Sequence, residues 1–171
     1  VRYAAGLPND SGTVPPRRAD VINLSVGGPG FSTATQAVYD QARATGVVIV
    51  AAAGNDANSI PFFPAAYPGV IGVSAVDIAK SLAPYSSFGP WVSVAAPGGN
   101  TARDLNGDGK PDGVLSTVAT DTGGTLVNDY VIWQGTSMAT PHLAGVVALM
   151  KSVAPNLTPR ELSTLLAGGA L

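Results

Sequence analysis

The sequence contains no cysteine, only one histidine and few charged residues. Because cysteine is absent, disulfide bonds and thiolate metal sites are both excluded. Charged residues make up 12% of the 171 residues, about half the usual fraction for a globular protein. The formal net charge is −2, and Arg17 and Arg18 are the only adjacent basic residues. This charge pattern argues against nucleic acid as a partner.

Long apolar runs are absent as well. The longest run, residues 46–54, covers about nine residues, too few to span a bilayer, so no membrane partner is expected. The sequence opens at Val1 without methionine, in a stretch that reads as the end of a helix stopping at Gly6. We therefore expect the chain to have been cut from a longer one. Its low charge predicts that protein outside this sequence covers part of its surface.

Apolar β-branched runs alternate with amphipathic stretches in the first half. Strands are predicted, in chain order, over 20–26, 47–52, 70–76 and 91–95. A helix over 33–45, with Thr33 and Gln36 spaced as a capping box, joins the first two strands. Strand, helix and strand with short loops form a βαβ unit. We therefore expect an α/β fold with a mainly parallel sheet and helices on both faces.

The second half of the chain has a different pattern. Two apolar stretches, 114–119 and 129–133, flank a glycine turn at 121–125, which predicts a hairpin. A helix over 137–152 is apolar nearly all round and is therefore expected to be buried. A last helix is predicted to begin after Thr158, with Glu161 at the capping-box distance.

The segment 135–141, GTSMATP, places Ser137 at the start of the predicted buried helix. A helix N-terminus carries free N–H groups and partial positive charge, which stabilise a negative oxygen. The amide of Ser137 is therefore a candidate oxyanion donor, and its hydroxyl is a candidate nucleophile. Pro141 cannot donate to the carbonyl of Ser137, so the first turn is expected to be loosened there. Taken alone, the segment favours a plain N-cap at Ser137 or Thr136.

A second candidate lies where a buried strand ends. Residues 51–54 close that strand at its carboxyl edge, where parallel α/β sheets bind ligands. Asn55, the next residue, can present its side-chain amide to a developing oxyanion. Taken alone, an asparagine in this position is also typical of a turn.

Five motifs stand in the same order as in a known family. They are NLSVGG at 23–28, AAAGN at 51–55, FPAAYP at 63–68 with VIGV at 70–73, SFGP at 87–90 with VAAPG at 94–98, and GTSMATPHLAG at 135–145. Over nearly the whole chain these motifs resemble the subtilisin-like serine proteases, or subtilases. The resemblance implies a subtilisin-like α/β fold that is represented here only by its C-terminal half.

The resemblance also implies roles for individual residues. Ser137 matches the nucleophile, and Asn55 matches the side-chain oxyanion donor. The substrate-binding strand, whose backbone pairs with an extended peptide, is matched by Leu24, Ser25, Val26 and Gly27. One wall of the pocket for the side chain before the scissile bond is matched by residues 51–54, with Ala52 and Gly54 as the candidates. Such small residues leave room for a large apolar side chain, unless Phe62 or Phe63 refills the space.

Two catalytic groups of the family are missing. A serine hydroxyl needs an adjacent base, and the base needs an orienting carboxylate. The family takes them from Asp-Ser/Thr-Gly and His-Gly-Thr-His motifs upstream of the substrate-binding strand, and neither motif occurs before Asp20. We therefore expect residues 1–171 to be the C-terminal part of one peptidase catalytic domain, inactive alone. The implied partners are a peptide or protein substrate and the N-terminal half, which supplies Asp and His; the implied parent is a secreted serine endopeptidase.

Two residues imitate the missing groups. His142, five positions after Ser137, lies about 140° round a helix and about 7.5 Å further along, so it is read as a packed helix residue. Asp121 opens an Asp-Thr-Gly motif that follows Asn55 and is read as a hairpin turn. The same motif leaves an aspartic protease as an alternative. The missing base leaves another, a non-catalytic binding or assembly fragment on a protease scaffold.

A polar loop near the middle of the chain has the spacing of a calcium site. Its oxygen ligands stand at positions one, three, five and nine, with a backbone carbonyl at seven: Asp104, Asn106, Asp108, Asp112 and Lys110, respectively. Gly109, at position six, permits the sharp turn. Position twelve is Leu115 rather than the glutamate of an EF-hand. A structural calcium ion is therefore expected, with a solvated Asx turn as the alternative.

Overall fold

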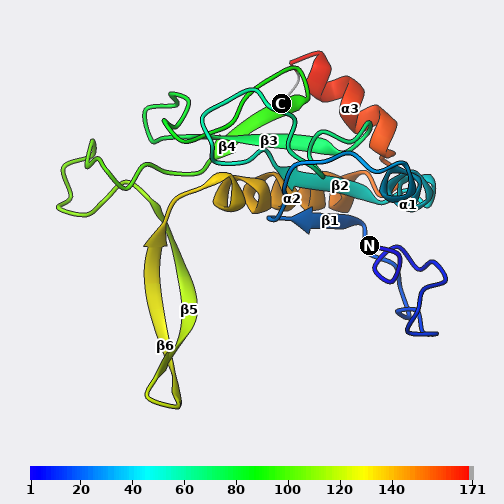
Figure 1. The fold of residues 1–171 in the computed structure, drawn as a ribbon, viewed down its shortest axis with the longest axis horizontal. Helices are drawn as coiled ribbons and strands as arrows, with labels where there is room; N and C mark the ends of the chain where they lie inside the picture. Colours follow the sequence, from blue (N-terminus) through cyan, green and yellow to red (C-terminus); the bar gives the residue numbers. More distant parts are fainter. Residues whose placement is uncertain (170–171) are drawn as a thin grey trace.

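The computed structural model describes residues 1–169, which are built on a four-stranded sheet (Figure 1). The order is β1-β2-β3-β4, with strands at Val21–Leu24, Val48–Ala52, Ile71–Val76 and Val92–Pro97. All three pairings are parallel. The two central strands are almost entirely buried runs of small and β-branched residues, as strands covered on both faces require. The α/β class and the parallel sheet are thus confirmed.

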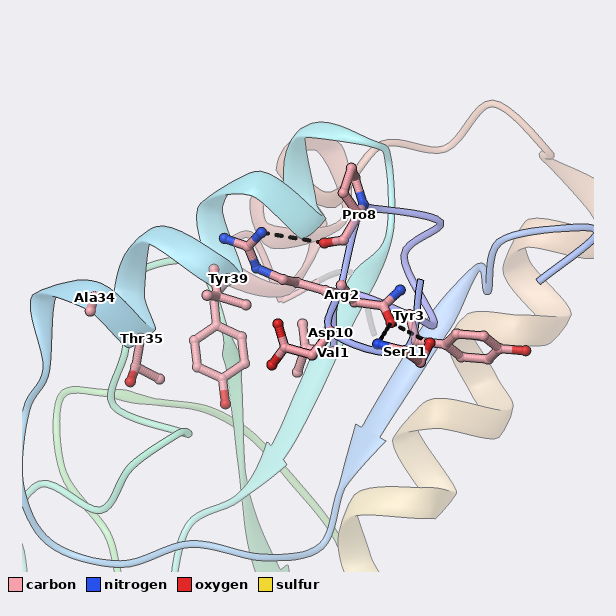
Figure 2. Close-up of a pocket in the computed structure, with 11 residues that line it drawn as sticks. Val1, Arg2, Tyr3, Pro8, Asp10, Ser11, Ala34, Thr35 and Tyr39 are labelled. Atoms are coloured by element: carbon pink, nitrogen blue, oxygen red, sulfur yellow. Dashed lines mark hydrogen bonds between the residues drawn. The ribbon is translucent and has the colours of Figure 1, made fainter. Parts of the chain in front are cut away.

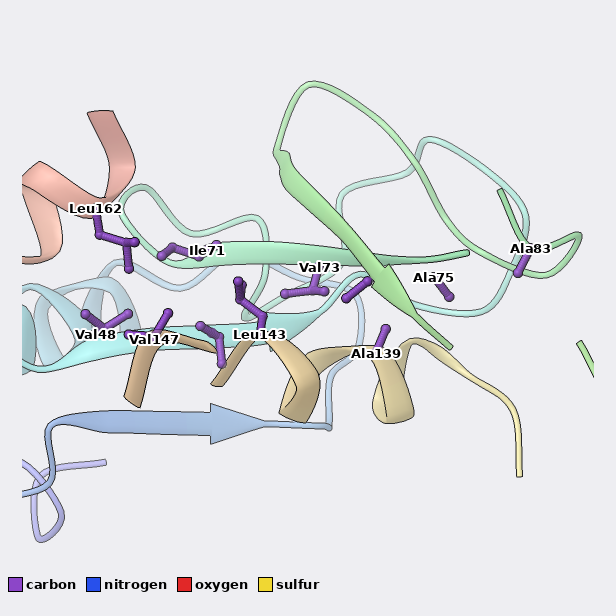
Figure 3. Packing of buried hydrophobic residues seen from close by; sticks show 11 residues of the cluster. Val48, Ile71, Val73, Ala75, Ala83, Ala139, Leu143, Val147 and Leu162 are labelled. Carbon is purple, nitrogen blue, oxygen red and sulfur yellow. The ribbon is translucent and has the colours of Figure 1, made fainter. Parts of the chain in front are cut away.

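Three helices complete the fold: α1 at Thr33–Ala44, α2 at Thr136–Val153 and α3 at Pro159–Ala167. Helices α2 and α3 pack on one face of the sheet through Leu143, Val147 and Leu162 (Figure 3). Helix α1 packs on the other face through Tyr39 and Ala42. Because successive side chains of a strand point to opposite faces, β2 contributes to both cores. The expectation of helices on both faces is confirmed.

The start of α1 differs from the predicted capping box. The N-cap is Ser32 rather than Thr33, and its hydroxyl accepts from the amide of Thr35 at 3.3 Å. The side chain of Gln36 does not turn back to the cap; it donates to Asp40 at 2.8 Å. A serine one position earlier offers an equally good oxygen, so spacing alone could not select the cap.

Helix α2 is not buried all round, so this part of the prediction is wrong. Its inner face is covered by the sheet, but Val146, Leu149 and Val153 are 44%, 69% and 85% exposed. These three residues, called here the apolar face of α2, point away from the sheet-side core. An apolar composition predicts burial only when enough other elements are present to cover every side.

The predicted hairpin is confirmed. Strands β5, Val114–Thr122, and β6, Thr125–Trp133, pair antiparallel and form a separate two-stranded ribbon. Figure 1 shows this ribbon projecting away from the four-stranded sheet. At its tip, Asp121 accepts the amide of Gly124 at 2.7 Å. The Asp-Thr-Gly motif is therefore an Asx-type turn, as interpreted from the sequence.

One predicted helix end, at Thr158, is confirmed, whereas the predicted helix tail before Gly6 is present only as a turn. Near the N-terminus, Leu7 donates to the carbonyl of Arg2 at 2.9 Å, and Gly6 has a φ of 71°, the pattern of a helical turn that ends at glycine. At the start of α3, Thr158 and Glu161 form a reciprocal capping box. The backbone amide of Thr158, and then its hydroxyl, bind the Glu161 carboxylate and hold its pKa below the usual value.

Candidate functional site

Ser137 lies in the first turn of α2, where the sequence predicts it. The N-cap is Gly135, and its φ of 148° is a backbone conformation that favours glycine. Within residues 1–169, the amide of Ser137 donates to no backbone acceptor. The helix therefore keeps a free N–H group beside the serine hydroxyl, at its positive end.

The first turn of α2 is tied to the end of β1 by two hydrogen bonds. The hydroxyl of Ser25 donates to the carbonyl of Ser137 at 2.8 Å. The hydroxyl of Ser137 donates to the carbonyl of Ser25 at 3.2 Å. Pro141 has no N–H to offer the Ser137 carbonyl, so Ser25 supplies the missing donor. The predicted loosening of this turn thus has a specific partner, 112 residues away in the chain.

Asn55 lies directly against the start of α2. Its Oδ1 accepts from the amide of Thr136 at 2.9 Å and from the hydroxyl of Thr136 at 3.0 Å. Because both donors meet the oxygen, the amide nitrogen is left with its two N–H groups for another acceptor. The Thr136 hydroxyl also accepts from the buried amide of Gly54 at 3.2 Å. Thr136 therefore sets the orientation of Asn55.

Gly135 is anchored from the side of β4. Its amide donates to the carbonyl of Gly98 at 3.0 Å. The hydroxyl of Tyr85 lies 2.9 Å from the same carbonyl and 2.8 Å from that of Gly99. Burial raises the pKa of Tyr85, and the Gly135 backbone partly offsets this. The turn that carries Ser137 is thus bound to the backbone carbonyls of two residues, Gly98 after β4 and Ser25 after β1.

The two predicted substrate-binding segments lie on either side of this turn. Leu24 and Ser25 are half-buried at the end of β1, and the residues that follow, Val26 and Gly27, are exposed. Ala52 and Gly54 are buried at the end of β2. Because parallel strands end at the same edge of a sheet, both segments reach the Ser137 turn.

A cavity of about 410 Å³ opens beside Ser137. It lies between the base of the hairpin and the first turns of α2, and is lined by residues 114–118, Trp133, Ser137, Met138, Pro141 and His142. The Nδ1 atom of His142 lies 2.8 Å from the carbonyl of Met138, one helical turn back. His142 is therefore bound to its own helix, although it is exposed rather than packed as expected.

Comparison with known proteins decides the family. Residues 2–170 match the family model described as the subtilase family.

The chain belongs to the subtilase family.

Subtilases are serine proteases, so the chain is placed among the hydrolases. It is 43% identical over 151 residues to an extracellular protease of Xanthomonas campestris pv. campestris and 42% identical over 143 residues to a subtilisin of Bacillus pumilus. A solved protease structure from Pseudoalteromonas arctica PAMC 21717 superposes with a TM-score of 0.87 at 38% identity.

These matches cover most of this chain but only part of the relatives. The match takes 86% of the chain but 24% of the Xanthomonas protein, and 81% of the chain but 45% of the Bacillus protein. The superposition on the Pseudoalteromonas structure covers 96% of this chain and 48% of that chain. The subtilase chain therefore spans a quarter to a half of the length of the relatives it matches. None of the helices in residues 1–169 combines the length and apolar character needed to cross a bilayer.

The loop 104–112 of this subtilase is organised by its own carboxylates. Asp104 accepts the amides of residues 107–109, and Asp108 accepts the amide of Lys110 at 2.8 Å. In the part of the chain that the structure describes, no three acidic or histidine side chains converge on a common point. Asp112 is only 7% exposed, and its Oδ1 has no hydrogen-bond partner there. In residues 1–169 the predicted ligands are therefore not gathered into a preformed metal site, although a buried carboxylate oxygen is of the kind that calcium prefers.

A larger cavity, of about 940 Å³, lies apart from these groups (Figure 2). It is bounded by the N-terminal residues and by α1, whose Thr35 and Tyr39 line it. Arg2 donates across its rim to the carbonyl of Pro8 at 3.3 Å. None of the predicted site residues lines this cavity.

Sequence reasoning missed three groups that hold the site together. The hydroxyl of Thr136, the hydroxyl of Ser25 and the carbonyl of Gly98 are all within hydrogen-bond reach of the Ser137 turn or of Asn55. All three residues stand inside the five family motifs, and this position in the sequence was the available signal. Which atom each side chain would meet was not readable, because the partners are 81 and 112 residues away.

Proposed function

We propose that this chain supplies the nucleophile and the oxyanion hole of a subtilisin-like serine endopeptidase. One observation carries the proposal. Ser137 stands at the N-terminus of α2 beside Asn55, whose oxygen is occupied by Thr136 and whose amide N–H groups are therefore available. Family membership supports the same reading. The chain is read as the C-terminal part of one catalytic domain.

The proposed chemistry is acyl transfer. The hydroxyl oxygen of Ser137 attacks the carbonyl carbon of a peptide bond, and a base takes its proton. The amide of Ser137 and Nδ2 of Asn55 donate to the oxyanion that forms. The amine leaves with a proton, and water then hydrolyses the acyl-enzyme. An extended substrate would pair with the backbone of residues 24–27.

The base and its carboxylate are proposed to come from protein outside this sequence, namely the N-terminal half of the same protease. Two features support this partner. Strand β1 ends the sheet order, so one of its edges has no strand partner within residues 1–169. The cavity beside Ser137 leaves room for an incoming side chain. A secreted location is proposed because the Xanthomonas relative is named an extracellular protease.

A fluorophosphonate that labels activated serines tests the proposal. We expect intact-mass analysis to show no adduct on the chain alone, because within residues 1–169 the Ser137 hydroxyl meets a backbone carbonyl rather than a base. Protein expressed from the complete gene is expected to gain one adduct, which Ser137→Ala removes. A Ser163→Ala variant, which changes an α3 hydroxyl bound to Pro159, is the matched control. Absence of labelling in the complete protein would favour the non-catalytic scaffold.

We also propose that the loop 104–112 binds a structural calcium ion. The ligands would be the side chains of Asp104, Asn106, Asp108 and Asp112, with the carbonyl of Lys110. The unpartnered, buried Oδ1 of Asp112 supports this assignment. A bound divalent cation would neutralise three carboxylates held within nine residues.

A further inference from the structure

The ring of Phe62 fills the space between the two substrate-binding segments. A methyl group placed on Gly27 would overlap this ring, with Cδ1 only 2.7 Å away. A methyl group on Gly54 would lie 3.1 Å from Cγ and 3.2 Å from Cδ2 of the same ring. Gly54 also has a φ of 101°. Both glycines are therefore in direct contact with Phe62, one from each side.

The backbone around Phe62 is fixed by several hydrogen bonds. Gly28 and Phe63 exchange two backbone bonds of 2.8 Å each, which form an isolated antiparallel bridge. The carbonyl of Phe62 accepts from the amide of Ala66 at 2.9 Å. The backbone is thus fixed at the Phe62 carbonyl and at Phe63, and the half-buried ring of Phe62 lies between the two glycines.

Phe63 takes a different place. Its ring centroid lies 4.7 Å from that of Tyr67 and 5.8 Å from that of Phe31, in an aromatic cluster against α1. The sequence analysis considered both Phe62 and Phe63 for this space. Only Phe62 has ring atoms close to both Gly27 and Gly54.

The two glycines that contact the Phe62 ring are connected to the Ser137 turn. Gly27 follows two residues after Ser25, which exchanges two hydrogen bonds with Ser137. Gly54 donates to the hydroxyl of Thr136, the neighbour of Ser137. In the resemblance to subtilases, residues 51–54 match one wall of the pocket for the side chain that precedes the scissile bond, and the backbone of residues 24–27 pairs with the substrate.

We propose that Phe62 shortens this pocket, so that the protease cleaves after small residues such as alanine rather than after large apolar ones. This inference rests on the proposed function, and it specifies the class of peptide that the protease would cleave. A large side chain would have to displace the ring of Phe62, whereas a methyl group requires much less space. Hydrophobic pockets discriminate by roughly 10–200-fold for each methylene they refuse.

The test uses protein expressed from the complete gene and peptide p-nitroanilides that differ only in the residue before the cleaved bond. We expect kcat/KM for alanine to exceed that for phenylalanine by about 100-fold. Phe62→Gly should reverse this preference, and Phe62→Leu should reduce it, with alanine still cleaved. Phe31→Leu, in the neighbouring aromatic cluster, is the matched control and should leave the ratio unchanged.

Two results separate failure of this inference from failure of the proposed function. Equal cleavage after phenylalanine and alanine by the unmodified protein would overturn the role of Phe62 while leaving the peptidase intact. An unchanged ratio in folded Phe62→Gly and Phe62→Leu would do the same. No cleavage of any peptide, with no fluorophosphonate adduct, would overturn both.

Discussion

At the scale of single residues, a serine hydroxyl replaces a backbone N–H as the hydrogen-bond donor to the carbonyl of Ser137. A proline in the second turn of α2 removes the N–H that would normally reach the carbonyl of Ser137. Ser25 supplies a hydroxyl in its place and receives the Ser137 hydroxyl in return. One local defect of a helix therefore becomes a link between the Ser137 turn and the residue that follows β1.

This exchange predicts a coupling between Ser25 and Pro141. Ser25→Ala should lower the free energy of unfolding by about 1 kcal/mol, because the Ser137 carbonyl loses its donor. In a Pro141→Ala background the restored helical N–H can serve that carbonyl, so the same change should cost less. Urea unfolding of the four proteins measures the difference. Strictly additive effects would mean that the two donors do not replace one another.

At the scale of elements, the loop 104–112 is unusual because its own side chains supply its hydrogen-bond acceptors. Its carboxylates bind the amides of the loop itself, which keeps it folded back without a cation. The exception is the buried Oδ1 of Asp112, which has no partner within residues 1–169. The buried oxygen without a partner is therefore the place where we expect an ion to bind.

Calcium should therefore raise the melting temperature of the chain. Saturation at about 100 times Kd would add about 2.7 kcal/mol to the free energy of unfolding. Asp108→Asn keeps an oxygen for the Lys110 amide but removes one charge, so it should weaken binding about tenfold. Asp129→Asn, in the hairpin, is the control. Titration calorimetry at millimolar calcium that shows no heat, with no shift in melting temperature, would contradict calcium binding.

At the scale of the whole molecule, apolar side chains remain exposed on several elements. The apolar face of α2 and most of the β5–β6 ribbon are exposed to solvent, and within residues 1–169 one edge of β1 has no strand partner. Figure 1 shows the ribbon projecting away from the four-stranded sheet. Apolar patches and unpaired strand edges of this kind are typical of surfaces that bind protein. They agree with the low charge of the sequence and with the partial coverage of the relatives.

The chain by itself is expected to associate. Light scattering over a range of concentrations should give masses above the 17.1 kDa of one chain. Leu149→Lys, on the apolar face of α2, should reduce this association, because it places a charge where a partner would bury an apolar side chain. Lys80→Arg, in an exposed turn, is the control. A stable, cooperatively unfolding monomer at every concentration would contradict the expectation.

The sequence by itself determined the class of the fold and the candidate groups. Strand and helix periodicity, the caps at Thr158 and the glycine turn of the hairpin depend on neighbours within a few residues, so local patterns reveal them. The order of the motifs around residues 24–27, Asn55 and Ser137 pointed to the family for the same reason. Each motif is short, and its side-chain types are dictated by local chemistry.

Only the tertiary structure decided which atoms meet. It assigned Ser25 to the Ser137 carbonyl, Thr136 to Asn55, and Phe62 rather than Phe63 to the space between the glycines. It also showed that α2 keeps an apolar face in solvent. These contacts join segments that lie far apart in the sequence. They depend on how strands and helices pack, and local patterns along a chain carry no record of that packing.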